Sequence, residues 1–386
     1  MIRRLALAMP TLSPLGGGVS EAARLHLTAL APAGFEQISV HTLDDSMEKV
    51  DPAQWAAAKL YLHRFYGPKS YSLAPGMLLS LLRAKPDLVH VHGVWQFQCA
   101  AVHLWSMITG KPYVVSPHGM LEPWIRARSA KLKGAVSSLY QDRFLKKAAG
   151  FHLLTDKETT DVAEFLTGQP AEIVRNFAQP FVSDGGKPGW WKPEFDGRNV
   201  YLFLGRIHEK KGCMELMDAW AKLSADDADF RARSVLVFCG WNDGIQGFEA
   251  RAEELGRQFG NVLFAGPQYG PDKHRSMGIA RYFLLPSKSE GLPMAVLEAW
   301  AAGVPAILTP ECNLATGFEH GAAFRTGFTP ETIYPALKAA HALPAEEWQA
   351  ASLRAKALVA EEFSEESVRS GLLGLYQAAS AWKARR

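Results

Sequence analysis

The chain has 386 residues, of which 48% are hydrophobic and 21% are charged, and its formal net charge is +3. This length exceeds one ordinary hydrophobic core, so two globular domains are expected. The small net charge does not indicate a nucleic-acid partner, and none is predicted.

The cysteines are Cys99, Cys213, Cys239 and Cys312, and no two of them form a Cys-x-x-Cys pair. This argues against a zinc site and a disulfide framework and fits a reducing cytoplasm. The apolar run Leu5–Met9 is too short for the core of a signal peptide and is predicted to be the first strand. The nearest candidate for a membrane span, Val94–Ile108, is interrupted by polar residues. We expect a cytoplasmic protein that meets a membrane from one side only.

Short apolar runs alternate with helical patterns along the whole chain. Strands are expected at Leu5–Met9, Ile38–Thr42, Leu88–Val91, Tyr113–Ser116, Gly150–Leu154, Val200–Leu204, Ser234–Cys239, Val262–Ala265, Tyr282–Pro286 and Ala306–Thr309. Helices are expected at Val19–Ala31, Pro75–Ala84, Lys157–Leu166, Cys213–Leu223, Glu249–Phe259, Pro293–Ala302, Glu331–Ala342 and about Glu365–Ala384. Continuous apolar strands between helices indicate α/β parallel sheets that are covered on both faces.

Two such sheets fit the length, and the Gly- and Pro-rich segment 176–198 is the expected break between them. The predicted domains are residues 1–178 and 179–364. We expect the last helix, about 365–386, to pack back on the first domain. Ligands of parallel sheets bind at the carboxyl ends of the strands, so residues at those ends are the candidates for function.

The first candidate is "PTLSPLGGGVSEAARLHL", in which Gly16, Gly17 and Gly18 lie between a strand and a helix. Glycines at a helix N-terminus bring backbone amides close to a phosphate. The segment matches neither Gly-x-Gly-x-x-Gly nor a P-loop. The alternative is a flexible turn with Ser20 as the helix cap, and the residues alone leave both interpretations open.

Histidines mark two further strand ends, in "VHVHGVW" and "VVSPHGMLEPW". We expect His90 and His92 to point to opposite faces of their strand, with His92 and the nearby Trp95 facing a cleft on the acceptor side. Two histidines without a third ligand do not indicate a metal site. His118 follows a strand on a Pro-His-Gly turn, where it could donate to a substrate hydroxyl. For both His92 and His118 the alternative is a structural histidine.

Two cations follow another strand, in "YLFLGRIHEKKGCMELMDAW". Arg206 leaves the strand end, and Lys211 precedes Gly212 at a helix start. A guanidinium and an ammonium in front of a helix N-terminus suit a diphosphate. Ordinary solvated surface charge is the alternative, and we assign it to Lys210.

Two glutamates flank a turn in "SKSEGLPMAVLEAWAAGVP". Pro293 is predicted in the first turn of the helix, and the amides between Gly291 and Met294 would form an anion site. Leu292 lies within this turn. Glu290 is expected to lie beside a sugar. Glu298 is expected to accept from ribose hydroxyls, because its apolar neighbours make an unpartnered carboxylate costly.

Taken together, these motifs resemble the retaining glycosyltransferases of family four, which have the GT-B fold of two facing Rossmann-like domains. The likeness is strongest in "FLGRIHEKKG" and "FLLPSKSEGLPMAVLEAWAAGVPAILT", and it includes the spacing of Glu290 and Glu298. The chain departs from the family at the crossover, where "VRNFAQP" replaces the usual Pro-Asn-Gly and the linker with Trp190 and Trp191 is long.

The resemblance implies an active site in an interdomain cleft and a UDP- or GDP-sugar donor, with no cofactor. It also implies a role for each residue: Arg206 and Lys211 for the diphosphate, Glu298 for ribose, Glu290 and His118 for the transferred sugar, and Gly17 and Gly18 for the phosphates from the opposite domain. The strand ends carry no Asp-x-Asp metal motif, so a transfer without metal is expected. Retention by same-face attack needs no enzymic nucleophile. A covalent role for Glu290 is the alternative.

The segment 124–148 is basic and partly apolar: it carries seven Lys and Arg residues against one Asp. It suits an anionic membrane surface, on the inner face of the cytoplasmic membrane, and a glycan or lipid-diphosphate-linked acceptor. An ordinary helix with a solvated basic face is the alternative. The resemblance implies a role in bacterial exopolysaccharide, capsule or lipopolysaccharide synthesis.

Competing functions are a sugar-nucleotide epimerase or phosphorylase on the same fold and a non-catalytic protein that binds sugar nucleotides. The two glutamates and the Arg206–Lys211 run favour a transferase over the epimerase or phosphorylase. A periplasmic binding protein would need an export signal, which the sequence is not expected to carry, and hydrolysis of a nucleotide sugar without acceptor would exclude a non-catalytic protein. A nicotinamide dehydrogenase would need a dinucleotide fingerprint and an acidic residue at the right spacing, and the chain lacks both.

Overall fold

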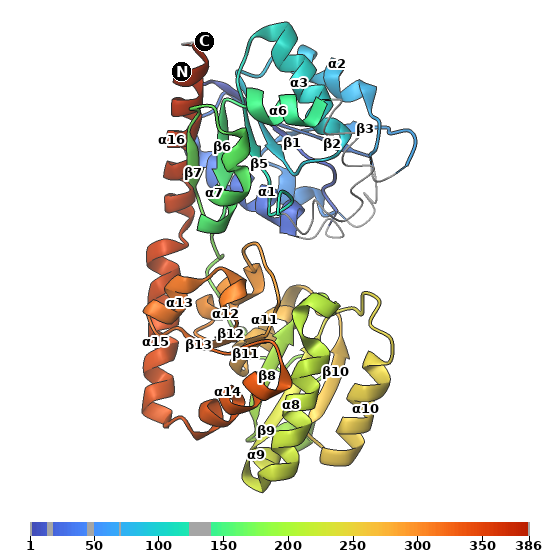
Figure 1. Cartoon of the computed structure of the whole chain (residues 1–386), viewed down its shortest axis with the longest axis vertical. Helices are drawn as coiled ribbons and strands as arrows, with labels where there is room; N and C mark the ends of the chain where they lie inside the picture. Colours follow the sequence, from blue (N-terminus) through green and yellow to red (C-terminus); the bar gives the residue numbers. More distant parts are fainter. Residues whose placement is uncertain (1, 14–17, 45–49, 69–70, 123–139, 385–386) are drawn as a thin grey trace. The chain divides into compact units, whose positions relative to one another are not determined.

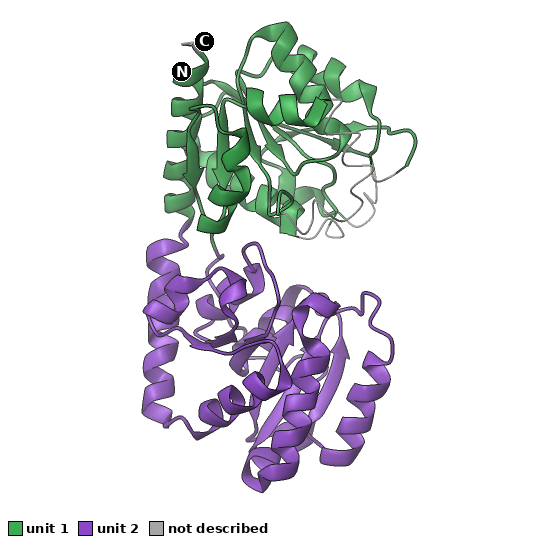
Figure 2. Ribbon diagram, viewed as in Figure 1, with its two compact units in different colours: residues 1–177, 365–386 green, residues 178–364 purple. Residues whose placement is uncertain are grey.

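The computed structural model describes residues 2–13, 18–44, 50–68, 71–122 and 140–384. Gly16, Gly17 and most of the basic segment 124–148 lie outside the described residues. The chain divides into two compact units (Figure 2). Unit 1 is residues 1–177 with 365–386, and unit 2 is residues 178–364.

Unit 1 contains a seven-stranded parallel sheet in the order β3-β2-β1-β4-β5-β6-β7 (Figure 1). Its strands are β1 Arg4–Ala8, β2 Gln37–Leu43, β3 Lys59–His63, β4 Leu88–His92, β5 Tyr113–Ser116, β6 Gly150–Leu153 and β7 Ala171–Ile173. Its helices are α1 Gly18–Leu30, α2 Pro75–Ala84, α3 Phe97–Thr109, α6 Asp142–Lys147, α7 Asp156–Val162 and α16 Glu365–Ala384.

Alternate residues of the unit 1 strands face two helical layers. Val89, Val91 and Val115 belong to the core that includes residues of α2, α3 and α6. The side chains between them on β4 face α1 and α16: the phenol oxygen of Tyr376 on α16 lies 2.8 Å from Nδ1 of His90. The last helix therefore packs on unit 1, although the whole of unit 2, residues 178–364, separates it from the rest of unit 1 in the sequence.

Unit 2 contains a six-stranded parallel sheet in the order β10-β9-β8-β11-β12-β13. Its strands are β8 Asn199–Leu204, β9 Ser234–Cys239, β10 Val262–Gly266, β11 Ala280–Leu285, β12 Ala306–Leu308 and β13 Ala323–Arg325. Its helices are α8 Cys213–Asp226, α9 Ala228–Arg233, α10 Phe248–Phe259, α11 Gly270–Gly278, α12 Met294–Ala301, α13 Ala315–Glu319, α14 Pro330–Ala342 and α15 Ala345–Glu362.

The strand order changes direction at β8, which pairs with β9 on one side and with β11 on the other. The connections that follow β8 and β11 therefore start side by side at the carboxyl end of the sheet, where parallel sheets bind their ligands. These connections carry Arg206, Lys211 and Glu290.

The parallel α/β fold class predicted from the sequence is confirmed, and all ten expected strands are present. Three short strands, β3, β7 and β13, were not expected. The apolar stretch Val94–Ile108 forms most of α3, with Trp105 fully buried. No helix among the described residues has both the length and the apolar composition to cross a bilayer.

Candidate functional site

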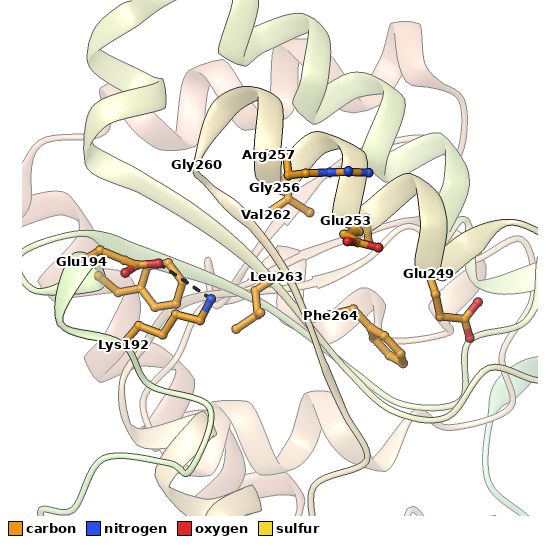
Figure 3. A pocket seen from close by; sticks show the side chains of 12 residues that line it. Lys192, Glu194, Glu249, Glu253, Gly256, Arg257, Gly260, Val262, Leu263 and Phe264 are labelled. Atoms are coloured by element: carbon orange, nitrogen blue, oxygen red, sulfur yellow. Dashed lines mark ion pairs between the residues drawn. The ribbon is translucent and has the colours of Figure 1, made fainter.

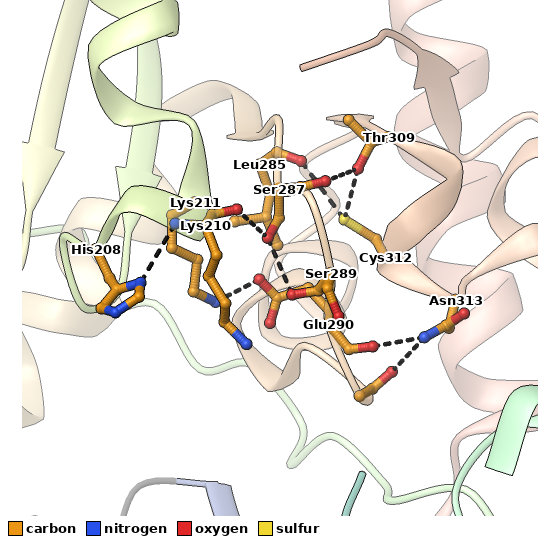
Figure 4. Close-up of polar contacts among 11 residues, drawn as sticks. His208, Lys210, Lys211, Leu285, Ser287, Ser289, Glu290, Thr309, Cys312 and Asn313 are labelled. Carbon is orange, nitrogen blue, oxygen red and sulfur yellow. Dashed lines mark hydrogen bonds and ion pairs between the residues drawn. The ribbon is translucent and has the colours of Figure 1, made fainter. Parts of the chain in front are cut away.

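The connections after β8 and β11 are fastened to each other by hydrogen bonds (Figure 4). The carbonyl of Lys210 accepts from the amide of Lys288 at 2.7 Å and from Oγ of Ser287 at 2.9 Å. Oγ1 of Thr309, just beyond β12, donates to the carbonyl of Ser287 at 2.5 Å. Three neighbouring strands thus set the position of one turn.

Gly212 is required by the close approach of these connections. Its φ of +68° is left-handed, and a Cβ at this position would lie 2.3 Å from the carbonyl oxygen of Pro286. Only glycine fits such a contact without moving the backbone. Gly212 is also the residue that caps α8 at Cys213, and the preceding Lys211 contacts Glu290 in the turn after β11.

Lys211 and Glu290 form a buried ion pair. The Nζ–Oε1 distance is 2.6 Å, and the side chains are 16% and 8% exposed. Burial alone would raise the pKa of Glu290, but the charges of Lys211 and Lys210 and hydrogen bonds from Lys211 and Ser287 hold it below its usual range. Taking a carboxylate and an ammonium out of water costs free energy, which their mutual attraction need not offset. Such a pair is therefore expected where both charges have a function.

Asn313 holds the backbone on the other side of Glu290. Its Nδ2 donates to the carbonyls of Glu290 at 2.5 Å and Gly291 at 3.3 Å, and its own φ is +56°. In the described part of the chain, the amides of Gly291 and Leu292 have no acceptor. A Cβ on Gly291 would meet nothing within 4 Å. The turn therefore offers free amides beside open space, as an anion site requires.

The helix after this turn differs slightly from the prediction. It begins at Met294, and Pro293 precedes it as the capping residue. Pro293 has no N–H, so it cannot donate to an anion. Glu298 lies about one turn into α12, and its Oε1 is 2.6 Å from Nζ of Lys273 on α11. The sequence predicted that Glu298 needs a partner but did not identify Lys273.

Arg206 is exposed, and its Nη1 lies 3.1 Å from Oδ2 of Asp243, in the connection after β9. No contact between Arg206 and the Lys211–Glu290 pair occurs among the described residues. The structure therefore places both cations at the switch point of the sheet but does not bring them together.

Unit 1 contributes a second group of predicted residues. His118 has a φ of +54° and Trp95 a φ of +78°, conformations that cost energy in residues other than glycine and are frequent at functional sites. Nδ1 of His92 lies 3.0 Å from Nε2 of His118. Nε1 of Trp95 donates to the carbonyl of Met120 at 3.1 Å. The connections after β4 and β5 are thereby joined, and His92, Trp95 and His118 lie in one small region.

The turn at His118 is held by a carboxylate that the sequence did not reveal. Glu158 on α7 is buried and accepts from the amides of Gly119 and Leu154, the latter at 2.6 Å. Burial raises its pKa despite these two bonds. Glu158 thus ties the turn after His118 to the backbone at the end of β6.

The expectation that His90 and His92 point to opposite faces is wrong. Residues two apart on a strand share a face, and the two imidazoles stack with centroids 4.3 Å apart. Both side chains are fully buried. His92 still reaches His118 at the strand end, whereas His90 belongs to the core.

His90 is part of a hydrogen-bonded chain through the buried face. Nε2 of His152 must donate to the carbonyl of Val174 at 2.7 Å, so its Nδ1 accepts from Oγ of Ser116 at 2.7 Å. Ser116 then accepts from Nε2 of His90 at 2.6 Å, and Nδ1 of His90 accepts from Tyr376. These hydrogen bonds assign a neutral tautomer to His90 and to His152.

The glycine-rich segment is only partly described. Gly17 lies outside the described residues, and Gly18 is the first residue of α1 with open space around it. Ser20 is inside the helix and donates to the carbonyl of Thr11 at 2.9 Å, so it is not a cap.

Two carboxylates, Asp227 and Asp229, match an Asp-x-Asp pattern in their spacing alone. Asp227 caps α9 by accepting from the amide of Phe230 at 2.9 Å. Asp229 pairs with Arg233 at 3.4 Å and His341 at 2.9 Å. Both carboxylates have structural roles. No group of three or more metal-ligating side chains suited to an ion occurs in the described ranges.

Two cavities of unit 2 lie near β10. One, of about 460 Å³, opens beside its carboxyl end and is lined by Gly189, Trp190, Ala265, Pro267, Gln268, Tyr269 and Asp272. Asp272 directly precedes Lys273, the partner of Glu298. The other, also about 460 Å³, lies between β10, α10 and the Lys192–Glu194 pair and contains none of the predicted residues (Figure 3).

Comparison with known families divides the chain as the structure does. Residues 17–176 match the family described as "Glycosyl transferase 4-like domain", and residues 191–333 match "Glycosyl transferases group 1". The first range lies within unit 1, and the second within unit 2.

Relatives extend this likeness. A D-inositol 3-phosphate glycosyltransferase of Pseudarthrobacter chlorophenolicus is 27% identical over 85% of this chain and 83% of its own. A protein of the same name from Jonesia denitrificans is 30% identical, over 61% of this chain and only 58% of its own. A GDP-mannose:cellobiosyl-diphosphopolyprenol alpha-mannosyltransferase of Xanthomonas campestris is 26% identical, over 65% and 63%.

Among solved structures, Anabaena Alr3699/HepE in complex with UDP and glucose superposes with a TM-score of 0.71 at 14% identity, covering 97% of this chain and all of that chain. Such an identity supports the fold alone. The solved structure and the parallel sheet of each unit therefore show the GT-B fold. The two family matches in chain order show that the chain belongs to the glycosyltransferases, with a glycosyl transferase 4-like N-terminal domain and a group 1 C-terminal domain.

Proposed function

We propose that the chain transfers a hexose-type sugar from a UDP- or GDP-sugar to a glycan or lipid-linked glycan acceptor, with retention of configuration. The observation that carries the donor assignment is the buried Lys211–Glu290 pair beside the free amides of Gly291 and Leu292. An ammonium and two amides at one turn are suited to the negative charge of a diphosphate.

The roles of the donor residues follow from their positions. Lys211 and the turn amides would stabilise the departing diphosphate, and exposed Arg206 would add a second cation by exchanging Asp243 for phosphate. Glu290 would accept from hydroxyls of the sugar. Glu298, held by Lys273, would accept from ribose, and the cavity at Trp190 and Tyr269 beside α11 has room for the base.

These groups could stabilise the leaving charge without a divalent ion, which electrostatic catalysis permits if the donors are preorganised. Turnover should therefore persist in excess EDTA, and its complete loss would refute transfer without metal. Same-face attack with the departing phosphate as proton acceptor explains retention without a nucleophile. A trapped glycosyl adduct on Glu290 would overturn that reading.

On the acceptor side, His118 would contact the transferred sugar, and Trp95 would line the approach of the acceptor. His92, whose side chain is fully buried, would act through its contact with His118. The strained backbone of His118 and Trp95 supports a role in binding. A bacterial surface polysaccharide, built at the inner face of the cytoplasmic membrane, is the proposed product.

The relatives favour one other acceptor class, an inositol phosphate, because three of them are named D-inositol 3-phosphate glycosyltransferases. Product analysis separates the candidates. The purified chain is incubated with labelled UDP- or GDP-sugars and with either D-inositol 3-phosphate or a diphosphate-linked lipid oligosaccharide. Transfer of label to the lipid oligosaccharide supports the proposal, and transfer only to the inositol phosphate replaces it.

The same experiment tests the competing activities. Isomerised nucleotide sugar would indicate an epimerase, and sugar phosphate formed from glycan and inorganic phosphate would indicate a phosphorylase. Binding without any turnover, including hydrolysis, would indicate a non-catalytic binding protein.

A further inference from the structure

Unit 1 has a cavity that none of the proposed donor or acceptor residues lines. Its volume is about 570 Å³, and it lies among α3, α6, the start of β5 and the end of α16. It is lined by His103, Ser106, Met107, Tyr113, Arg143, Lys146, Lys147 and Lys383. Four of these side chains are permanent cations, and none is acidic.

The four cations are not neutralised by ion pairs within the described residues. Arg143, Lys146 and Lys147 are exposed, Lys383 is half-buried, and none forms an ion pair with a carboxylate of the described chain. Their effect is visible at His103, whose pKa is lowered by burial and by the charges of Arg143, Lys147 and Lys383. Like charges from α6 and α16, distant in the sequence, are therefore concentrated around one hollow.

The cations are mounted on a rigid support. Phe144 and Leu145, between the basic residues of α6, are fully buried. The hydroxyl of Tyr113 donates to the carbonyl of Phe144 at 2.5 Å, and their rings stack at 5.0 Å. With this face of α6 fixed to the core, the basic side chains are directed outward without the entropy cost of ordering a loose segment.

Exposed apolar side chains border the same cavity. On α3, Leu104 is 43% exposed, Ile108 63% and Met107, which lines the cavity, 69%. Large apolar side chains that gather on a surface usually mark an interaction site. Cations beside projecting apolar groups are typical of segments that lie at a bilayer interface, where lipid phosphates meet the acyl chains.

We propose that this face of unit 1 binds an anionic bilayer, with a lipid phosphate in the basic cavity and Leu104, Met107 and Ile108 inserted at the headgroup–acyl boundary. The charge of the cavity selects an anion, and the apolar border favours a lipid phosphate over a free one. The proposal does not depend on the donor chemistry, because it involves neither the Lys211 turn nor the His118 turn.

The test is flotation of the full chain with vesicles of phosphatidylcholine alone or of an equimolar mixture with phosphatidylglycerol. We expect binding to the mixed vesicles only. Because each cation near an anionic surface contributes roughly fivefold to binding, Arg143→Gln with Lys147→Gln should weaken it at least about tenfold. The matched control is Lys222→Gln with Lys338→Gln, which removes the same charge from exposed lysines of unit 2 and should bind as the parent does.

A second variant tests the exposed apolar side chains of α3. Met107→Ser with Ile108→Ser keeps every cation and should also weaken binding. Millimolar inorganic phosphate should not displace the parent from vesicles. Equal flotation of the Arg143/Lys147 variant and its control, or displacement by inorganic phosphate, would overturn the proposal. Hydrolysis of the donor in solution by the same variants shows separately whether the proposed function holds.

Discussion

Lys211 and Glu290 form the buried ion pair on which the proposed donor site depends. Removing one partner of a buried pair leaves the other charge uncompensated, at a cost of about 3–5 kcal/mol. Lys211→Ala should therefore lower both the unfolding free energy and turnover, the latter by ~10²-fold or more. Lys187→Ala is the control, because Lys187–Asp196 has the same 2.6 Å separation but is 55% and 59% exposed, and such pairs contribute at most about 1 kcal/mol.

The double variant Lys211→Met with Glu290→Gln separates stability from function. Two neutral side chains should recover much of the lost stability while turnover stays low. If the double variant regained turnover, the pair would be structural. The lowered pKa of Glu290 also predicts how the stability of the protein depends on pH. The stabilisation from ionised Glu290 is present above the pKa of a glutamate in the unfolded chain and is lost as the pH falls through the lower pKa of the folded state.

At the scale of single residues, the sequence could not predict which side chains form ion pairs and hydrogen bonds with each other. The pairs Glu298–Lys273 and Arg206–Asp243 join residues 25 and 37 positions apart. Asn313 reaches the Glu290 turn from the connection after another strand. No local pattern encodes these contacts, because they arise only when the sheet aligns its strand ends. The motif residues themselves could be identified, since their chemistry is local.

At the scale of elements, the junction of β8, α8 and the turn after β11 depends on Gly212. Gly212→Ala should place a methyl against the carbonyl of Pro286 and displace the Lys211–Glu290 turn. Gly34 is a matched control: its φ is +80°, but a Cβ there would meet nothing within 4 Å. Thermal unfolding should show about 1–2 kcal/mol lost for Gly34→Ala and a larger loss, with reduced donor affinity, for Gly212→Ala. Equal losses would show that the close approach is tolerated.

The chain of buried histidines ties β4, β5 and β6 to α16, and it predicts an acid-sensitive unit 1. Burial lowers the pKa of His90 well below its usual value and that of His152 to about 4. The unfolded chain takes up these protons near pH 6.5 and the folded chain does not, so stability falls as the pH drops below 6.5. Each such histidine costs about 2 kcal/mol between pH 6.5 and 5.

Hydrogen exchange of β4–β6 amides at several pH values measures this dependence locally. His90→Gln should reduce the slope of the unfolding free energy against pH by the equivalent of about one bound proton, whatever it does to the stability at pH 7. His320→Gln, which changes an exposed histidine of unit 2, should leave it unchanged. An unaltered slope in His90→Gln would mean that His90 is not neutral in the native state.

The elements found from the sequence are those with strong patterns. The strand "NVYLFL" is a continuous apolar run and was placed almost to the residue. Strands β3, "KLYLH", and β7, "AEI", were missed because edge strands are short and polar. The prediction for His90 and His92 was wrong because it placed residues two apart on opposite faces, whereas only neighbouring residues of a strand point to opposite faces.

At the scale of the whole chain, each unit has its own parallel sheet and carries its own share of the proposed site residues. The proposed donor residues Arg206, Lys211, Glu290 and Glu298 belong to unit 2, and His92, Trp95 and His118 belong to unit 1. The proposed function therefore requires both units, although the sequence crosses between them only around residue 178 and around residue 364. Order and spacing of motifs along the chain indicated this division, because each domain carries a complete set of strands.

The central claim is that Arg206, Lys211 and the amides after Glu290 hold the donor diphosphate. Calorimetric titration with UDP and GDP tests it most directly, comparing the parent chain, Arg206→Ala with Lys211→Ala, and the control Lys222→Ala with Lys338→Ala. Two charge-assisted contacts contribute about 3 kcal/mol or more together, so the first variant should bind the preferred diphosphate about a hundredfold more weakly while the control binds as the parent does. An unchanged affinity in the Arg206/Lys211 variant would contradict the account.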